Sequence, residues 1–185
     1  MTTQGHLFFT ISTSFLIQHF ICSQFMHHDD WWRIIPISII TCLLPDIDHS
    51  KSIISKKLKY FSYIITKLFN HRGFTHSLCA IYLIYYILQI ISNKIIFLKM
   101  DIQLGLIIGY CTHIIADIIT PHGVLLLWPL KIRFKLPIIT RHLFTEKFFC
   151  YIYFVFSVYL LYPGYNHILI QFCIKTYIKL LNNIY

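Results

Sequence analysis

Residues 34–49 read IIPISIITCLLPDIDH, an apolar run that ends abruptly in two carboxylates and an imidazole. The whole chain has only seven Asp and Glu residues, and Asp46 and Asp48 are two of them. Together with His49 they offer hard oxygen ligands and a borderline nitrogen ligand to one cation. Four consecutive residues cannot enclose a cation alone, so we expect further ligands to come from other parts of the chain.

The composition indicates an integral membrane protein. Of the 185 residues, 57% are apolar and only 12% are charged, whereas about a quarter of a soluble domain is charged. An unusually apolar soluble helical bundle is the alternative on composition alone. We therefore interpret residues 1–185 as a single integral membrane domain of the all-α class.

The basic charge and the cysteines exclude two other classes of protein. The formal net charge is +9, but Lys and Arg are spread along the segments between apolar runs. Such residues are better explained by membrane orientation and anionic lipid than by nucleic acid, and no nucleic-acid partner is expected. The six cysteines are scattered singly without a Cys-x-x-Cys pair, which supports neither a zinc knuckle nor a disulfide framework.

Apolar stretches predict a polytopic helical bundle with about five or six spans. The stretches are residues 6–22, 34–44, 76–91, 102–120 and 148–162, with 168–181 either a sixth span or an interfacial helix. The 34–44 run is short for a full crossing, so its acidic end is expected near the membrane surface. Residues 53–69 alternate apolar positions and lysines at helical spacing, which predicts an amphipathic helix lying on the membrane.

The distribution of Lys and Arg predicts the orientation. These residues concentrate in the 46–75 and 129–147 connections. The positive-inside rule places both connections, and the N-terminus, in the cytoplasm. The short 92–101 loop carries two lysines and fits this assignment less well. The two motif-bearing connections nevertheless fall on the same side, which is required if their residues form one site.

A second cluster, residues 71–76, reads HRGFTH. Its two imidazoles stand five positions apart around a glycine, in a turn that leads into the third predicted span. The Thr75 hydroxyl is expected to cap the following helix. Arg72 cannot bind a cation, but it can hold a phosphate or carboxylate beside one. The alternative is a surface His-Arg pair at the membrane boundary.

The third cluster lies inside the fourth predicted span. His113 and Asp117 are four positions apart in a helix and so point from the same face. Ionisable residues at membrane depth are costly and are functional candidates by default; the alternative is a hydrogen-bonded pair that stabilises the bundle. His6 opens the first span at the end suited to join the site, although a lone imidazole is more often interfacial. His122 follows the third cluster and is a candidate supporting group.

Other catalytic motifs are missing from the sequence. It contains no phosphate-binding Gly-x-x-x-x-Gly-Lys-[Ser/Thr] loop, no Gly-x-Gly-x-x-Gly and no Gly-x-Ser-x-Gly elbow. Glu146 is the only glutamate, so a His-Glu-x-x-His metalloprotease helix is also excluded. Any general base must therefore be an aspartate, a histidine or water on a metal.

The three clusters together resemble a known family. LLPDIDH at 43–49, HRGFTHSL at 71–78 and His-x3-Asp-x2-Thr-Pro at 113–121 are similar to the bacterial inner-membrane family of metal-dependent hydrolases, and particularly to its YdjM-type members. The similarity includes Gly5-His6-Leu7, Trp31-Trp32 and the 124–129 stretch, and covers roughly residues 1–140. It implies an inner-membrane protein with a metal-dependent hydrolytic site. The ligands it implies are Asp46, Asp48, His49, His71, His76, His113 and Asp117.

The resulting hypothesis is a hydrolase at the cytoplasmic surface of the bacterial inner membrane. The expected metal ligands are those seven residues and His6; Asp48, Arg72 and His76 are also expected to be catalytic. Zinc is the first expectation, followed by manganese or magnesium. Seven ligands exceed the three or four of one zinc site, which implies two metals or a supporting shell. A metal-activated water would attack an ester or phosphoester, such as a lipid, while Arg72 holds the developing charge.

Two other functions use the same residues. A non-catalytic membrane protein would keep a saturated, structural metal. A divalent metal transporter would need charged residues along a path through both halves of the bilayer, whereas this sequence concentrates them towards one side. Neither the substrate nor the oligomeric state follows from the sequence.

Overall fold

The computed structural model describes residues 1–17, 19–20, 31–69, 72–92, 99–140 and 142–161. Within these residues the chain is all-helical, apart from one antiparallel bridge between Val124 and Phe134, and this confirms the predicted class. The α-helices are α1 (Thr3–Ile17), α3 (Trp31–Thr41), α4 (Ile53–Lys57), α5 (Lys59–Leu68), α6 (Leu78–Ser92), α7 (Met100–Ile118) and α8 (Leu143–Leu161). Two short 3-10 helices are η2 (Pro45–Asp48) and η3 (Phe74–His76).

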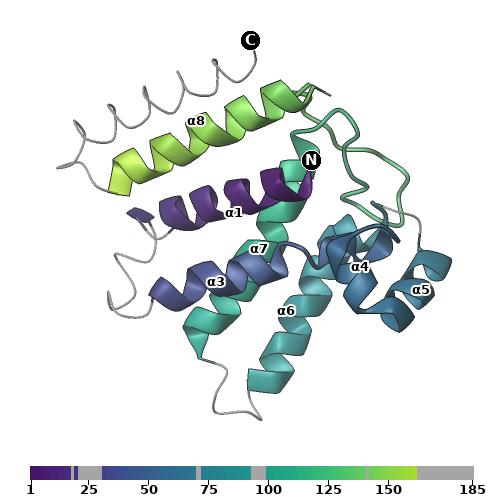
Figure 1. Ribbon diagram of the computed structural model, residues 1–185. Helices are drawn as coiled ribbons and strands as arrows, with labels where there is room; N and C mark the ends of the chain where they lie inside the picture. Colours follow the sequence, from purple (N-terminus) through teal and green to yellow (C-terminus); the bar gives the residue numbers. More distant parts are fainter. Residues whose placement is uncertain (18, 21–30, 70–71, 93–98, 141, 162–185) are drawn as a thin grey trace.

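The helices bring the three His- and Asp-bearing motifs of the sequence to one end of the bundle. Helices α8, α1 and α3 lie side by side, and α7 crosses α1 and α3 and contacts both (Figure 1). Helix α6 packs on α7, and η2 contacts η3, α7 and both short helices α4 and α5. The start of α1, the end of α3, the start of α6 and the end of α7 therefore meet.

Two of the described helices, α7 and α8, are long and apolar enough to cross a membrane, and α6 is apolar but shorter. The predicted five or six spans are therefore not established by the described residues. Helix α3 has only 11 residues, as the short apolar run before the acidic cluster suggests. Helix α1 corresponds to the predicted 6–22 span as far as Ile17. The candidate sixth span, 168–181, lies outside the described residues.

Hydroxyl groups and glycines join the buried faces of the long helices. The Thr10 and Thr112 hydroxyls are 2.9 Å apart, and those of Ser14 and Ser38 are also 2.9 Å apart. Gly109 of α7 lies directly against Ser38 and Thr41 of α3, where an added Cβ would collide with both residues. Small residues that allow close approach, and hydroxyls that bond between helices, are typical of membrane helix packing.

The predicted amphipathic helix 53–69 is instead two helices, because Leu58 between them leaves the helical conformation (φ −108°, ψ 55°). Ser55 and Ser62 each donate a hydrogen bond of 3.0 Å to the Ile47 carbonyl oxygen. In a continuous helix two residues seven apart are separated by about 10 Å along the axis. Both hydroxyls can therefore reach one carbonyl only if the helix is broken, and the break fixes α4 and α5 to η2.

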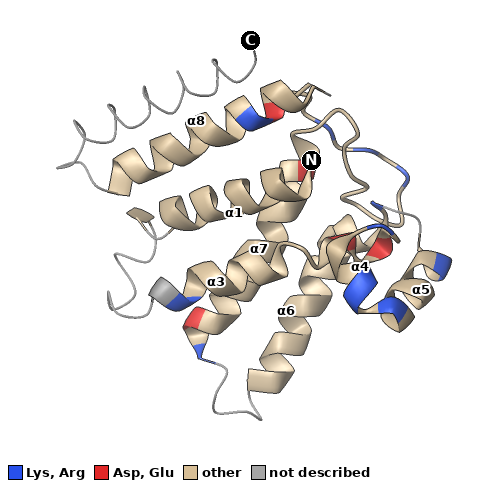
Figure 2. Cartoon of the chain, viewed as in Figure 1, with Lys and Arg blue, Asp and Glu red and all other residues tan. Residues whose placement is uncertain are grey.

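Helix α5 keeps the amphipathic character that its sequence predicts. Its exposed apolar side chains are Tyr60, Phe61, Tyr63, Ile64 and Leu68. Figure 2 shows lysines along α4 and α5, with further basic residues on the segment that leads to α8. These lysines and large apolar side chains are consistent with the predicted interfacial helix.

Candidate metal centre

Four segments deliver the side chains of the site. Pro45 occupies the first turn of η2, where its fixed φ suits a helix start, and Asp46 follows it. His76 ends η3, just before α6. Asp117 lies one turn after His113 on the inner face of α7, and both side chains are buried. His6 comes from the first turns of α1 and is 2% exposed.

Four potential ligand atoms converge between these segments. His76 Nε2 lies 3.3 Å from His113 Nε2 and 3.5 Å from Asp117 Oδ2. His113 Nε2 lies 3.8 Å from Asp117 Oδ2 and 3.5 Å from Asp46 Oδ1. The Asp46 Oδ1 atom is 3.9 Å from His76 Nε2. Three of these atoms, His76 Nε2, His113 Nε2 and Asp46 Oδ1, thus lie within 3.9 Å of one another, and Asp117 Oδ2 lies beside both imidazoles.

These separations fit a divalent metal. Imidazole and carboxylate ligands lie about 2.0–2.2 Å from zinc, so two ligands of a tetrahedral site are roughly 3.3–3.6 Å apart. Three of the five separations above, 3.3, 3.5 and 3.5 Å, lie in that range. The other two, 3.8 and 3.9 Å, are a few tenths of an ångström longer. The Asp117 Oδ2 atom is buried and has no hydrogen-bond partner among the described residues. A buried carboxylate oxygen directed at two imidazoles without a proton donor is suited to a cation.

His6 adjoins this set from the other side of His113. The two imidazole rings are stacked, with centroids 3.9 Å apart and planes within 6°. His6 Nε2 lies 3.5 Å from Asp117 Oδ1, and the Met1 amino group lies 3.0 Å from the same oxygen. His6, His113 and Asp117 form one possible ligand group, and Asp46, His76 and His113 form another; His113 belongs to both.

Asp48 lies behind His76, and its contacts orient that imidazole. Its Oδ2 atom accepts hydrogen bonds from the Thr75 hydroxyl at 2.6 Å and the Arg72 amide at 2.9 Å. The same oxygen is 3.4 Å from His76 Nδ1. A carboxylate on the outer nitrogen of a ligating histidine fixes the ring orientation and raises its basicity. Thr75, predicted to cap α6, bonds to Asp48 instead.

Arg72 approaches the cluster in an unusual backbone conformation. Its φ is +61°, in the left-handed region that is costly for a residue with a Cβ. Its amide is held by Asp48, and its carbonyl accepts a hydrogen bond from the Leu125 amide at 3.3 Å. The guanidinium Nη2 donates to Asp117 Oδ1 at 3.0 Å. Its Nε and Nη1 atoms are buried without a hydrogen-bond partner among the described residues.

The remaining predicted residues lie apart from the ligand atoms. His49 is partly buried at the end of η2 and belongs to neither group of converging ligand atoms in the described chain. His71 lies outside the described residues. His122 is exposed, and its carbonyl accepts a hydrogen bond from Arg133 at 3.2 Å. Thr120 donates to the Asp117 carbonyl at 2.7 Å.

Tyr110 is a residue of the site that the sequence motifs did not reveal. It lies on α7 one turn before His113, and its hydroxyl donates to the Thr75 carbonyl oxygen. This bond ties α7 to the η3 segment that bears His76. Tyr110 stands three residues before His113 and so lies on the same face of the helix, and this spacing could have identified it from the sequence.

The site favours the protonation states that metal ligands need. Burial alone would raise the pKa of Asp46, but the His113 hydrogen bond and the nearby imidazoles hold that pKa below its ordinary value. Burial lowers the pKa of His76, although Asp48 acts in the opposite direction. An ionised carboxylate and a neutral imidazole at neutral pH are the forms that bind a divalent cation.

The fold and the site define a class: a helical membrane protein that encloses a cluster of histidines and aspartates at one end of its bundle. The chain belongs to the YdjM inner membrane protein family, whose model matches residues 1–179. Membership identifies it as an inner membrane protein and confirms the resemblance predicted from the three motifs.

Individual relatives agree with this assignment. The chain is 41% identical over 162 residues to the inner membrane protein YdjM of Escherichia coli (strain K12), covering 86% of this chain and 83% of the relative. The same values hold for YdjM of Shigella flexneri. It is 37% identical over 100 residues to the uncharacterized protein YvsG of Bacillus subtilis (strain 168), covering 54% and 59% of the two chains. No solved structure matches the chain.

Proposed function

We propose that this protein is a metal-dependent hydrolase of an ester or phosphoester, with an amphiphilic substrate such as a membrane lipid. The observation that carries the proposal is the convergence of Asp46, His76 and His113 at ligand-to-ligand distances, with Asp117 beside both imidazoles. Two imidazoles and two carboxylates favour zinc, with manganese or magnesium as alternatives. The cytoplasmic orientation of this end of the bundle, from the positive-inside rule, is part of the same proposal.

The side chains around the candidate ligands have separate roles in this proposal. Asp48 accepts a hydrogen bond from Nδ1–H of His76 and so keeps Nε2 directed at the metal. The Arg72 guanidinium, anchored on Asp117, directs positive charge at an anionic group of the substrate. When bound, a divalent cation lowers the pKa of water and polarises a phosphoryl or carbonyl oxygen.

The first experiment is metal analysis of the purified protein. Wild-type protein, Asp117→Asn and the exposed-site control His142→Asn are compared by inductively coupled plasma mass spectrometry. We expect a stoichiometric metal in wild type and control and a loss in Asp117→Asn. Equal, near-zero metal in all three would contradict the metal site. A screen of loaded protein against phosphomonoesters, phosphodiesters and lipid esters then tests hydrolysis, with Arg72→Gln as the variant that keeps the metal but loses turnover.

The burial of the cluster favours a second candidate, a non-catalytic protein with a structural metal. His6, His76, His113 and Asp117 are each at most 2% exposed, and structural sites are typically closed to solvent. Asp46, whose side chain is 21% exposed, offers the hydrolase its route to substrate. Metal that exchanges within minutes and supports hydrolysis favours the enzyme. Metal that is retained against chelator, with no turnover in the screen, favours the structural role.

A further inference from the structure

A cavity of about 270 Å³ lies between the first turns of α1 and the first half of α8. Gly5 and Phe8, three residues apart on α1, face it, whereas His6 faces α7 and the metal centre. Cys150 of α8 also lines it and donates through Sγ to the Gly5 carbonyl at 3.7 Å. The cavity is therefore separate from the metal centre, although both are built on α1.

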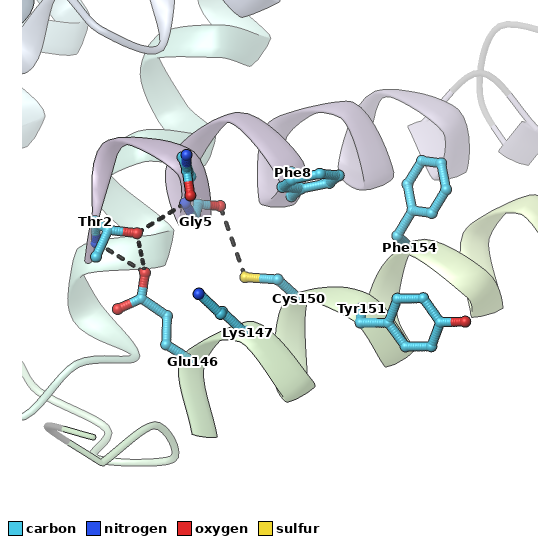
Figure 3. Close-up of a pocket in the computed structure, with 9 residues that line it drawn as sticks. Thr2, Gly5, Phe8, Glu146, Lys147, Cys150, Tyr151 and Phe154 are labelled. Carbon is cyan, nitrogen blue, oxygen red and sulfur yellow. Dashed lines mark hydrogen bonds between the residues drawn. The ribbon is translucent and has the colours of Figure 1, made fainter. Parts of the chain in front are cut away.

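The cavity has one polar end and one apolar end. Glu146, Lys147 and Thr2 lie at the polar end, and Phe8, Tyr151 and Phe154 lie towards the other (Figure 3). Cavities for small molecules are typically about 300–1,000 Å³, so this one takes a segment of one extended chain and not a whole bulky ligand. Separation of polar and apolar groups along one axis matches an amphiphile that inserts its tail first.

The charges at the polar end are not equivalent. Glu146 Oε1 accepts hydrogen bonds from the Thr2 amide at 2.8 Å and the Thr2 hydroxyl at 2.6 Å. That hydroxyl in turn accepts a hydrogen bond from the Gly5 amide at 3.1 Å. The Glu146 carboxylate therefore stabilises the first turn of α1 through Thr2. Lys147 has no hydrogen bond or ion pair among the described residues, and its side chain reaches towards the start of α1 (Figure 3). The Glu146 carboxylate is thus occupied by Thr2, whereas the Lys147 ammonium group has no partner among the described residues.

We propose that this cavity binds a phospholipid, with the lipid phosphate at Lys147 and an acyl segment against Phe8, Tyr151 and Phe154. The polarity of the cavity, the unpaired ammonium group and the inner-membrane family of the chain support this occupant. A lysine beside a membrane helix attracts lipid phosphate by about 1 kcal/mol, which corresponds to roughly fivefold in affinity. The inference is independent of the proposed hydrolysis, because none of these residues belongs to the metal centre.

The test is photo-cross-linking of the full-length protein in lipid nanodiscs. The probe is phosphatidylglycerol with a diazirine on its acyl chain, and labelled residues are identified by mass spectrometry. We expect labelling of Phe8, Tyr151 or Phe154, about fivefold weaker labelling in Lys147→Gln, and restoration in Lys147→Arg. The matched control, Lys135→Gln, removes an exposed lysine outside the cavity and should label as wild type does.

Competition identifies the group that Lys147 recognises. Unlabelled phosphatidylglycerol should displace the probe from wild-type protein, whereas diacylglycerol, which lacks the phosphate, should compete about fivefold less well. Equal labelling of the cavity in wild type, Lys147→Gln and Lys147→Arg would overturn the proposal, as would equal competition by the two lipids. Helical circular dichroism and thermal melting of the same samples show that Lys147→Gln, whose side chain lies on α8, is folded.

Discussion

At the scale of single residues, His113 has the central position in the site. Its Nε2 atom faces both Asp46 and His76, and its ring stacks on His6. It therefore belongs to both groups of converging ligand atoms. It is also fully buried within α7, where an ionisable side chain without a function is costly.

Replacement of His113 by alanine should abolish stoichiometric metal binding, because His113 belongs to both groups of converging ligand atoms in the described chain. The measurement is the metal content of protein purified in mild detergent, normalised to protein concentration. His142→Ala is the control, since that histidine is exposed and lies outside both ligand groups. A variant that keeps full metal would exclude His113 as a ligand.

Thr75 tests the supporting role of Asp48. Substitution of Thr75 by valine keeps the side-chain shape and removes the hydroxyl that donates to Asp48 Oδ2. Loss of such an outer partner typically costs about 10–100-fold in metal affinity, and we expect a loss in that range. Chelator competition measures it. Thr145→Val, which removes an exposed hydroxyl bonded to Thr140, should leave the affinity unchanged.

At the scale of elements, the contact between α3 and α7 depends on glycine. A Cβ at Gly109 would collide with the Thr41 hydroxyl and with the Ser38 backbone, which cannot move independently of α3. A Cβ at Gly105 would lie 3.0 Å from the Ile34 carbonyl oxygen and from Ile37 Cβ. The first collision requires the helices to separate, whereas the second can be relieved by small shifts.

Gly109→Ala should therefore destabilise the protein more than Gly105→Ala. Overpacking of a close contact costs typically about 1–3 kcal/mol, and Gly109→Ala should lie at the upper end of that range. Unfolding in detergent, followed by thermal melting and by loss of helical circular dichroism, measures the difference. Equal melting temperatures for the two variants would show that α3 and α7 do not approach as closely as the structure describes.

The segment between η2 and α5 shows what sequence patterns could and could not predict. Apolar spacing predicts helical structure over 53–69, and the residues are helical. The break at Leu58 was not predictable, because its cause is a tertiary contact: Ser55 and Ser62 both bond to the Ile47 carbonyl. Periodicity reports which face of a helix is apolar, but not which distant carbonyl a serine will reach.

The site shows the same limit. His113 and Asp117 could be paired from sequence because a helix fixes their spacing. The sequence could not distinguish the roles of the two aspartates. Asp46 faces the imidazoles, whereas Asp48 lies behind His76. The two aspartates stand two positions apart in the same motif, and the 3-10 turn that contains both directs them to different sides of His76. His49 was included for the same reason, although it lies outside both ligand groups.

At the scale of the whole molecule, the candidate ligands and most of the charged residues of the described chain collect at one end of the bundle, whereas Arg33, Lys99 and Asp101 lie at the other (Figure 2). Lysines of α4 and α5 and the basic segment before α8 lie at the end that holds the metal centre (Figure 2). Met100 begins α7 at the opposite end and is 70% exposed. Because basic residues favour the cytoplasmic side, the charge distribution predicts that the metal centre faces the cytoplasm and Met100 faces the other side.

Cysteine accessibility in intact cells tests this orientation. In a background with the six cysteines replaced by alanine, Lys51→Cys and Lys131→Cys should react with a membrane-impermeant maleimide only after lysis. Met100→Cys should react in intact cells, because it lies at the far end of α7, a helix long enough to span the bilayer. Labelling of Lys51→Cys without lysis would invert the topology. It would also place the proposed hydrolytic site on the outer side of the membrane, where the proposed substrates would have to be lipids of the outer leaflet or periplasmic molecules.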